Sequence, residues 1–118
     1  MEKRIIMENI AEKLAQKQLD AYNNQNLEEF LTVYSEDVEI YEFPSTLLYK
    51  GIGKMRERYD QLFQTNPNQH AALLSRMVNN NRVIDHEHVT GRANGVDVYA
   101  IAIYEVENDH ITKVWFIK

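Results

Sequence analysis

The chain has 118 residues, a length typical of one domain, and 44% of them are hydrophobic while 26% are charged. The formal net charge is -5 and the basic residues are scattered, which argues against a nucleic-acid partner. The absence of cysteine excludes disulfides, thiol catalysis and cysteine-based zinc sites.

No apolar stretch has the length of a membrane span, and the first residues, MEKRIIMEN, lack the apolar core of a signal peptide. The sequence has no repeat, linker or low-complexity segment. We therefore expect one domain over residues 1–118, a cytoplasmic location and no membrane partner.

The first half of the chain has helical periodicity. Residues 5–24 carry apolar side chains at helical spacing, and Asn26 with Glu29 predicts the start of a second, short helix. The segment DVEIY alternates like a strand that ends at Pro44, and residues 41–51 are expected to form a loop. A third helix is predicted after Gly51–Gly53. The apolar faces of the second and third helices are Leu27, Phe30, Leu31 and Tyr34, and Ile52, Met55, Tyr59, Leu62 and Phe63.

The second half reads as strands. The runs at 70–78, 82–92, 96–106 and 110–118 are separated by NNN, NG and END, and Asn94-Gly95 predicts a two-residue hairpin turn. Helices followed by an antiparallel meander indicate the α+β class, with the helices on one face of the sheet.

Three segments carry a family resemblance. AYNNQNLEEFLTVYSEDVEIYEFP, YKGIGKMRERY and AIAIYEVENDHITKVWFI are similar to the helix–helix–strand opening, the third helix and the closing hairpin of SnoaL-like and ketosteroid-isomerase-like proteins. These proteins belong to the nuclear transport factor two superfamily. The resemblance implies a cystatin-like cone, with three N-terminal helices packed on a curved, mostly antiparallel sheet.

The resemblance also implies site residues. The general-base aspartate of the isomerases falls on Glu42, which keeps a carboxylate at that position. Their oxyanion-hole tyrosine and protonated aspartate fall on Gln18 and Ala102, so these two donors are not carried over; ketosteroid isomerase is a standard example of such a neutral acid.

A second group of polar residues surrounds the sequence DHEH. If residues 80–81 and 94–95 form two-residue turns, Glu87 lies between Leu74 and Ala102, and Asp85 lies beside Arg76. By alternation His70 and Arg76 share this face. The cluster is either a buried ion pair in a closed core or one wall of a small-molecule pocket.

Alternatives remain for the other candidates. Glu42 is either a solvated loop charge or a pocket carboxylate, and Gln18 either bonds a backbone group in the core or lines the pocket. The aromatic residues, Tyr22, Tyr59 and Phe116 among them, either fill the core or line a hollow. His86 and His88 have no apparent third ligand, so we expect no metal.

These observations predict a small-molecule-binding domain for an apolar or carbonyl-containing compound, without a cofactor. Catalysis would be proton transfer of the isomerase, cyclase or dehydratase type, by Glu42 with His70 and Glu87. The alternatives are a non-catalytic binding or sensing module and a structural dimerisation domain. The predicted ligand contacts are Gln18, Tyr22, Tyr59, Arg76, Ala102 and Phe116.

The sheet face away from the helices is predicted to be apolar. Such a face usually marks an interface, so we expect a homodimer through it. The residues assigned to it are Ala71, Leu73, Met77, Ile84, Ile101, Ile103, Trp115 and Ile117.

Overall fold

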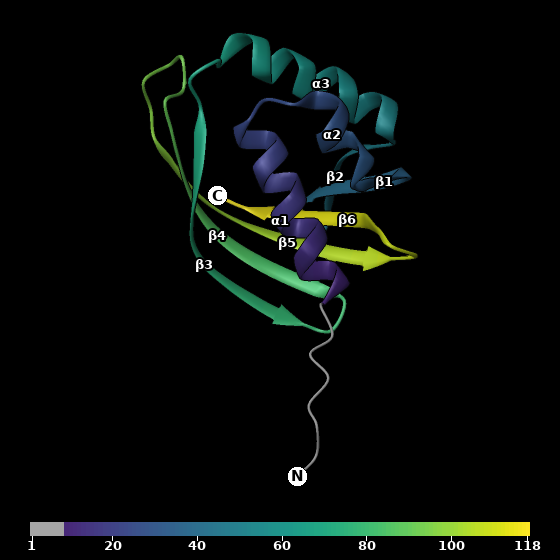
Figure 1. Ribbon diagram of the computed structural model, residues 1–118. Helices are drawn as coiled ribbons and strands as arrows, with labels where there is room; N and C mark the ends of the chain where they lie inside the picture. The colour runs from purple at the N-terminus through teal and green to yellow at the C-terminus, as the bar shows by residue number, and fades with distance from the viewer. Residues whose placement is uncertain (1–8) are drawn as a thin grey trace.

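The computed structural model describes residues 9–118 and has three helices on one face of a curved six-stranded sheet (Figure 1). This confirms the α+β class. The expectation of three N-terminal helices is not exact, because two strands precede the third helix. The elements are α1 (Ile10–Asn23), α2 (Leu27–Thr32), β1 (Tyr34–Glu42), β2 (Thr46–Lys50), α3 (Ile52–Thr65), β3 (His70–Asn79), β4 (Arg82–Thr90), β5 (Val98–Glu107) and β6 (His110–Ile117).

Both N-terminal helices begin at asparagine caps. The Asn9 side chain accepts from the Glu12 backbone N–H at 3.0 Å, and Asn26 accepts from the Glu29 N–H at 3.2 Å. The predicted cap at Asn26 is therefore confirmed, and each cap satisfies a backbone donor that the helix leaves free. The expected first helix extended to residue 5, but residues 5–8 lie outside the described part of the chain.

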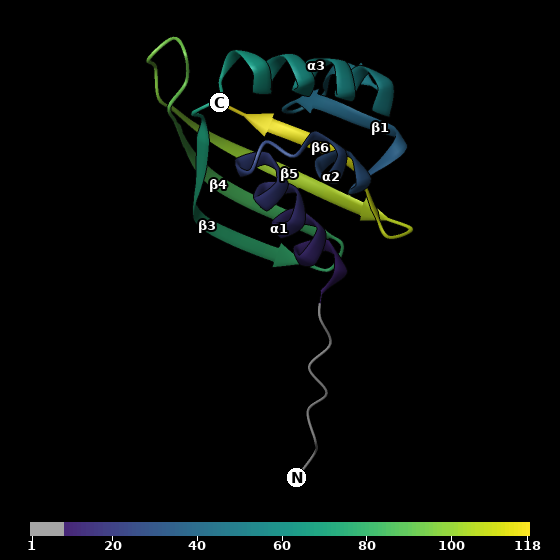
Figure 2. The same ribbon diagram turned by 45° about the horizontal axis from the view of Figure 1, so that its top comes forward.

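The sheet has the strand order β2-β1-β6-β5-β4-β3, in which β1 and β6 are parallel and every other pair is antiparallel. The turned view in Figure 2 shows α1 crossing the concave face of β3, β4 and β5, while α3 lies along β1. The two longer helices therefore cover different parts of the sheet.

The chain around β1 differs from the prediction. The apolar spacing predicts Tyr34 on the second helix, but α2 ends at Thr32 and Tyr34 opens β1. The segment expected to be a loop contains β2, which folds back antiparallel on β1 after a turn that includes the cis Phe43–Pro44 peptide. Every residue of β2 is at least partly exposed, so the strand has no buried face that would require alternating apolar residues. The strand therefore gave no sequence signal.

The registers of β4 also differ from the prediction. Asn80 and Asn81 form the expected turn, and Arg76 pairs with Asp85 as predicted. However, a loop of residues 91–97 replaces the two-residue turn, so Glu87 lies opposite Ala100 and not opposite Ala102. A shift of two residues keeps the same face, so Glu87 still points toward the helices.

A bulge in β3 between Leu73 and Ser75 reverses the alternation predicted for the start of that strand. Ala71 is 3% exposed and packs with Leu19 and Val89, and Leu73 packs against the same cluster. The two residues therefore lie on the helix side, contrary to the predicted outer face.

The same bulge explains which way two other residues of β3 face. His70, predicted to face inward, is exposed. Met77, beyond the bulge, is 64% exposed on the outer face as predicted. Among the described residues, no helix combines the length and hydropathy needed to cross a membrane.

Candidate functional site

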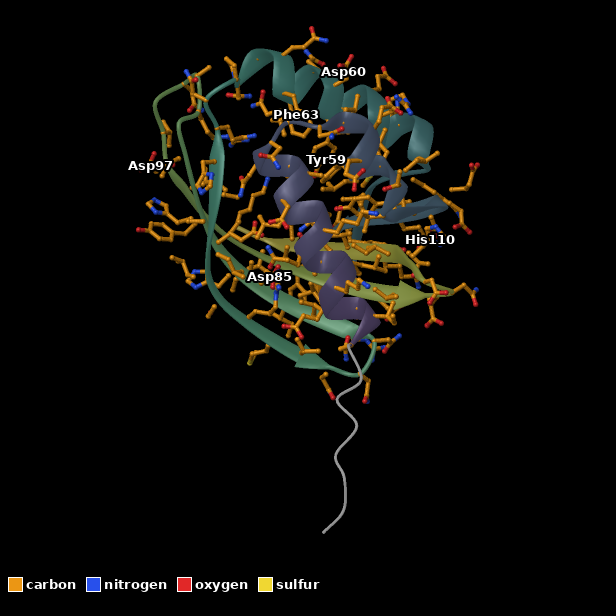
Figure 3. All side chains as sticks on the ribbon, in the orientation of Figure 1. Tyr59, Asp60, Phe63, Asp85, Asp97 and His110 are labelled. Carbon is orange, nitrogen blue, oxygen red and sulfur yellow. The ribbon has the colours of Figure 1, made fainter. Side chains whose placement is uncertain are left out.

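A cavity of about 530 Å³ lies between α1, α3 and the concave face of the sheet. Figure 3 shows Tyr59 and Phe63 pointing from α3 toward the sheet, while Asp60 points away from it. The lining includes Tyr59 from α3, Gln18 from α1 and Glu87 from β4. The core is therefore not completely filled, which favours a ligand-binding domain over a purely structural one.

Glu87 is the only side-chain carboxylate among the described residues that line this cavity. Its side chain is partly buried and makes no hydrogen bond or ion pair with any described residue. Burial raises the Glu87 pKa to about 7; the nearby charge of Asp85 also raises it, and Arg76 lowers it. Glu87 can therefore exchange a proton near neutral pH.

Asp85, two residues before Glu87, is committed to a different interaction. Its side chain is 0% exposed, and its two oxygens accept from Arg76 Nε at 2.7 Å and Nη2 at 2.9 Å. Arg76 Nη1 also donates to the Gln16 side chain at 2.9 Å. Asp85 and Arg76 therefore form a bidentate ion pair, and Glu87 remains the acidic side chain without a partner.

A chain of hydrogen bonds crosses the cavity wall at Gln18. Its amide nitrogen donates to the Ala15 carbonyl at 3.0 Å and to the Tyr104 hydroxyl oxygen at 2.9 Å. Its amide oxygen accepts from the Tyr34 hydroxyl at 3.1 Å. Both sequence interpretations of Gln18 are therefore realised, because it bonds a backbone carbonyl and also lines the cavity.

The Tyr104 hydroxyl is the free donor at the end of this chain. It accepts from Gln18, and its own hydrogen has no acceptor among the described residues. Burial raises the Tyr104 pKa well above its ordinary value, and the charge of Glu87 raises it further. The hydroxyl therefore stays protonated, and a bond accepted from Gln18 polarises it as a donor.

Aromatic side chains form much of the remaining wall. The rings of Tyr22 and Tyr59 have centroids 6.3 Å apart in an edge-on arrangement, and Phe116 also lines the cavity. Phe30 packs beneath them, with its centroid 4.5 Å from that of Tyr59. These rings offer a flat, apolar ligand a complementary surface.

The structure brings together five of the predicted site residues and leaves four outside. Glu42 is exposed and lies beside Phe116 at the end of β1, and Ala102 is buried between Asp85 and Phe116 without reaching the cavity. Their predicted roles are not tested by this placement. Gln18, Tyr22, Tyr59, Glu87 and Phe116 line the cavity, whereas Glu42, His70, Arg76 and Ala102 do not.

Basic residues on the cavity wall had no recognisable signal in the sequence. Arg58 lies on α3, Arg92 in the loop after β4, and Lys118 after β6. Ile101 pairs with Ile117, which places Lys118 level with Ala100 of β5. Ala100 in turn pairs with Glu87 of β4. Only the strand registers, and not sequence spacing, could have predicted this proximity.

The predicted absence of a metal site remains a prediction. No group of three or more histidine, aspartate or glutamate side chains within residues 9–118 is arranged to hold a metal ion. His88 instead stacks on Tyr99, with centroids 4.3 Å apart, and its Nε2 lies 3.5 Å from Asp97 Oδ2.

Together, the fold and the cavity define an α+β cone whose hollow contains one isolated carboxylate. The family model of the SnoaL-like domain matches residues 15–114. The chain therefore belongs to the SnoaL-like domain family. No curated protein matches it significantly.

Solved structures give the same fold. A cystatin-fold protein from Novosphingobium aromaticivorans has a TM-score of 0.83 at 23% identity, with 96% of this chain and 100% of that chain covered. A protein from Jannaschia sp. CCS1, named for SnoaL-like polyketide cyclases, has a TM-score of 0.78 at 13% identity, with coverage of 99% and 90%. A protein from Kribbella flavida, named for ketosteroid isomerases, has a TM-score of 0.75 at 20% identity, with 91% of this chain and 76% of that chain covered. At these identities the likeness establishes the fold alone.

Proposed function

We propose that this protein binds a small carbonyl compound in the cavity and moves a proton on the carbon next to the carbonyl group. The observation that carries the proposal is Glu87, an unpaired carboxylate inside the cavity with a pKa of about 7. A base with a pKa close to the working pH suits general acid–base catalysis. The Glu42 base implied by the resemblance stays a prediction, and its exposure makes Glu87 the stronger candidate.

The chemistry needs two groups, and the cavity contains both. The ionised Glu87 carboxylate removes a proton from the α-carbon and becomes neutral, and the C–H electron pair shifts to form an enolate. The Tyr104 hydroxyl donates a hydrogen bond to the enolate oxygen. In heavy water the neutral Glu87 carboxyl exchanges its proton for a solvent deuteron and delivers the deuteron to the same carbon, which gives exchange. Delivery to another carbon of a conjugated enolate gives isomerisation.

The test uses β-tetralone, a bicyclic ketone, in heavy water, with loss of the α-proton signal followed by NMR. We expect the wild-type protein to accelerate the exchange. Tyr104→Phe should lower the rate by about 10²–10³-fold, the usual effect of removing one donor to an oxyanion. Tyr41→Phe is the matched control, because Tyr41 bonds Glu39 away from the cavity. Binding of the ketone without exchange would favour the non-catalytic binding module.

We also propose that a second copy of the chain covers the outer face of the sheet. All three helices lie on the opposite face (Figure 1), and Met77 and Tyr99 are more than half exposed. Light scattering at micromolar concentration should give twice the chain mass, and Met77→Glu should lower the measured mass toward that of a single chain. A wild-type monomer would contradict the interface. The cytoplasmic location expected from the sequence remains a prediction.

A further inference from the structure

The charges on the cavity wall are opposite in sign to the charge of the whole protein. The chain carries a formal net charge of -5, yet the described lining holds three basic side chains, Arg58, Arg92 and Lys118, against the single acidic side chain of Glu87. Glu87 is only partly ionised near neutral pH because its pKa is about 7. The cavity is therefore a positive region in a negative protein, which attracts anions.

These three cations also differ from most of the other described basic residues, which form ion pairs. Arg56 binds Glu28, Arg82 lies 3.0 Å from Glu105, and Lys50 lies 3.3 Å from Glu39. The three cations of the cavity wall form no ion pair with any described carboxylate.

Aromatic rings support two of the unpaired cations. The Arg58 guanidinium lies 4.5 Å from the centroid of the Tyr49 ring, and Lys118 Nζ lies 5.7 Å from that of Phe116. Contacts of this kind hold a cation in place without neutralising its charge. The positive charge of both groups therefore remains available to a ligand.

The loop that carries Arg92 is held against the segment before β3. The Gln69 side-chain oxygen accepts from Arg92 Nε at 3.1 Å, and the Asn66 side chain accepts from the Ala93 N–H at 2.9 Å. Gly91 has φ 74°, and a Cβ there would lie 2.1 Å from a backbone oxygen of that segment. Nη1 and Nη2 of Arg92 make no bond to a described residue. The guanidinium is therefore anchored at one edge and free at the other.

We infer that the ligand carries a carboxylate in addition to its carbonyl group, and that Arg92 binds this carboxylate with Arg58 and Lys118 adding positive potential. The free edge of a guanidinium matches a carboxylate in a bidentate geometry. Tyr22, whose pKa responds to both Arg92 and Glu87, lies within electrostatic reach of the two groups. The substrate class is then an aromatic or otherwise apolar keto acid. The carbonyl group of this ligand rests on the proposed function, whereas the carboxylate does not.

The experiment compares two probes of the same shape, β-naphthoate and its uncharged amide β-naphthamide, by isothermal titration calorimetry at pH 8. We expect β-naphthoate to bind at least about tenfold more tightly, and this preference to shrink as salt is added. Arg92→Gln should weaken β-naphthoate binding about tenfold and leave β-naphthamide unchanged. Arg82→Gln is the control, because Arg82 pairs with Glu105 outside the cavity.

Equal affinity for the two probes would overturn the inference, as would no β-naphthoate binding at millimolar concentration. An unchanged affinity in Arg92→Gln would also overturn it. Glu87→Gln should strengthen β-naphthoate binding at pH 8, because it removes the negative charge of the one acidic side chain in the lining. These readouts measure binding, so a failure of β-tetralone exchange would count against the proposed chemistry and leave the carboxylate site standing.

Discussion

The Glu87→Gln variant is expected to lose the proposed proton exchange, with a fall in rate of about 10²–10⁴-fold. Glutamine keeps the shape of the side chain but cannot accept the proton. The wild-type rate should rise with pH and reach half its maximum near 7, because Glu87 acts as its ionised form and its pKa is about 7. The measurement is the exchange rate of β-tetralone by NMR from pH 5 to 9.

Glu42→Gln is the matched control for this experiment. The substitution is identical, but Glu42 is exposed and does not line the cavity. We expect it to retain the exchange rate and the pH profile. If the Glu42 variant loses activity and the Glu87 variant keeps it, the base implied by the family resemblance is correct and the assignment to Glu87 is wrong.

Stability gives a second readout for the Glu87 variant. The pKa of Glu87 is about 7 in the folded protein against an ordinary 4.5, so between these pH values the folded state binds more protons than the unfolded state. The contribution of Glu87 to the free energy of unfolding therefore falls as pH rises through this window, by up to about 3 kcal/mol. In urea denaturation, the free energy of unfolding of Glu87→Gln, relative to that of the wild type, should therefore increase from pH 5 to pH 8.

Much of the fold could be predicted because local patterns and tertiary packing agree. The apolar spacing of α3, the cap at Asn26 and the four strands after Pro67 are all present. The inward orientation of Glu87 also follows from alternation, since the error in its register was two residues. A shift of an even number of residues preserves the face of a strand.

Other features depend on contacts that no local pattern contains. The bulge after Leu73 turned His70 outward, and nothing in HAALLSRMV identifies where that strand gains a residue. The cavity is lined by residues of α1, α3 and the strands of the sheet, so it is a property of the assembled fold. Arg58 and Arg92 are far apart in the sequence, and each is unremarkable in its own segment.

The Asp85→Asn variant is expected to lower the free energy of unfolding by about 3–5 kcal/mol, the usual cost of breaking a buried ion pair. Asn cannot neutralise Arg76, whose side chain is only 10% exposed. Replacing both partners, as Arg76→Met with Asp85→Leu, should cost far less because no charge is left buried. Urea denaturation of the three proteins measures both effects, and equal losses in the single and double variants would contradict the ion-pair explanation.

Burial is the largest cause of the raised Glu87 pKa, and the same ion pair modifies it further. Asp85 raises the Glu87 pKa and Arg76 lowers it. In Asp85→Asn the opposing charge of Arg76 remains, so the midpoint of the exchange profile should move below 7. The double variant removes both influences and leaves burial, the largest cause, so its midpoint should stay near the wild-type value. A midpoint that does not move in Asp85→Asn would show that Glu87 is not the group that titrates.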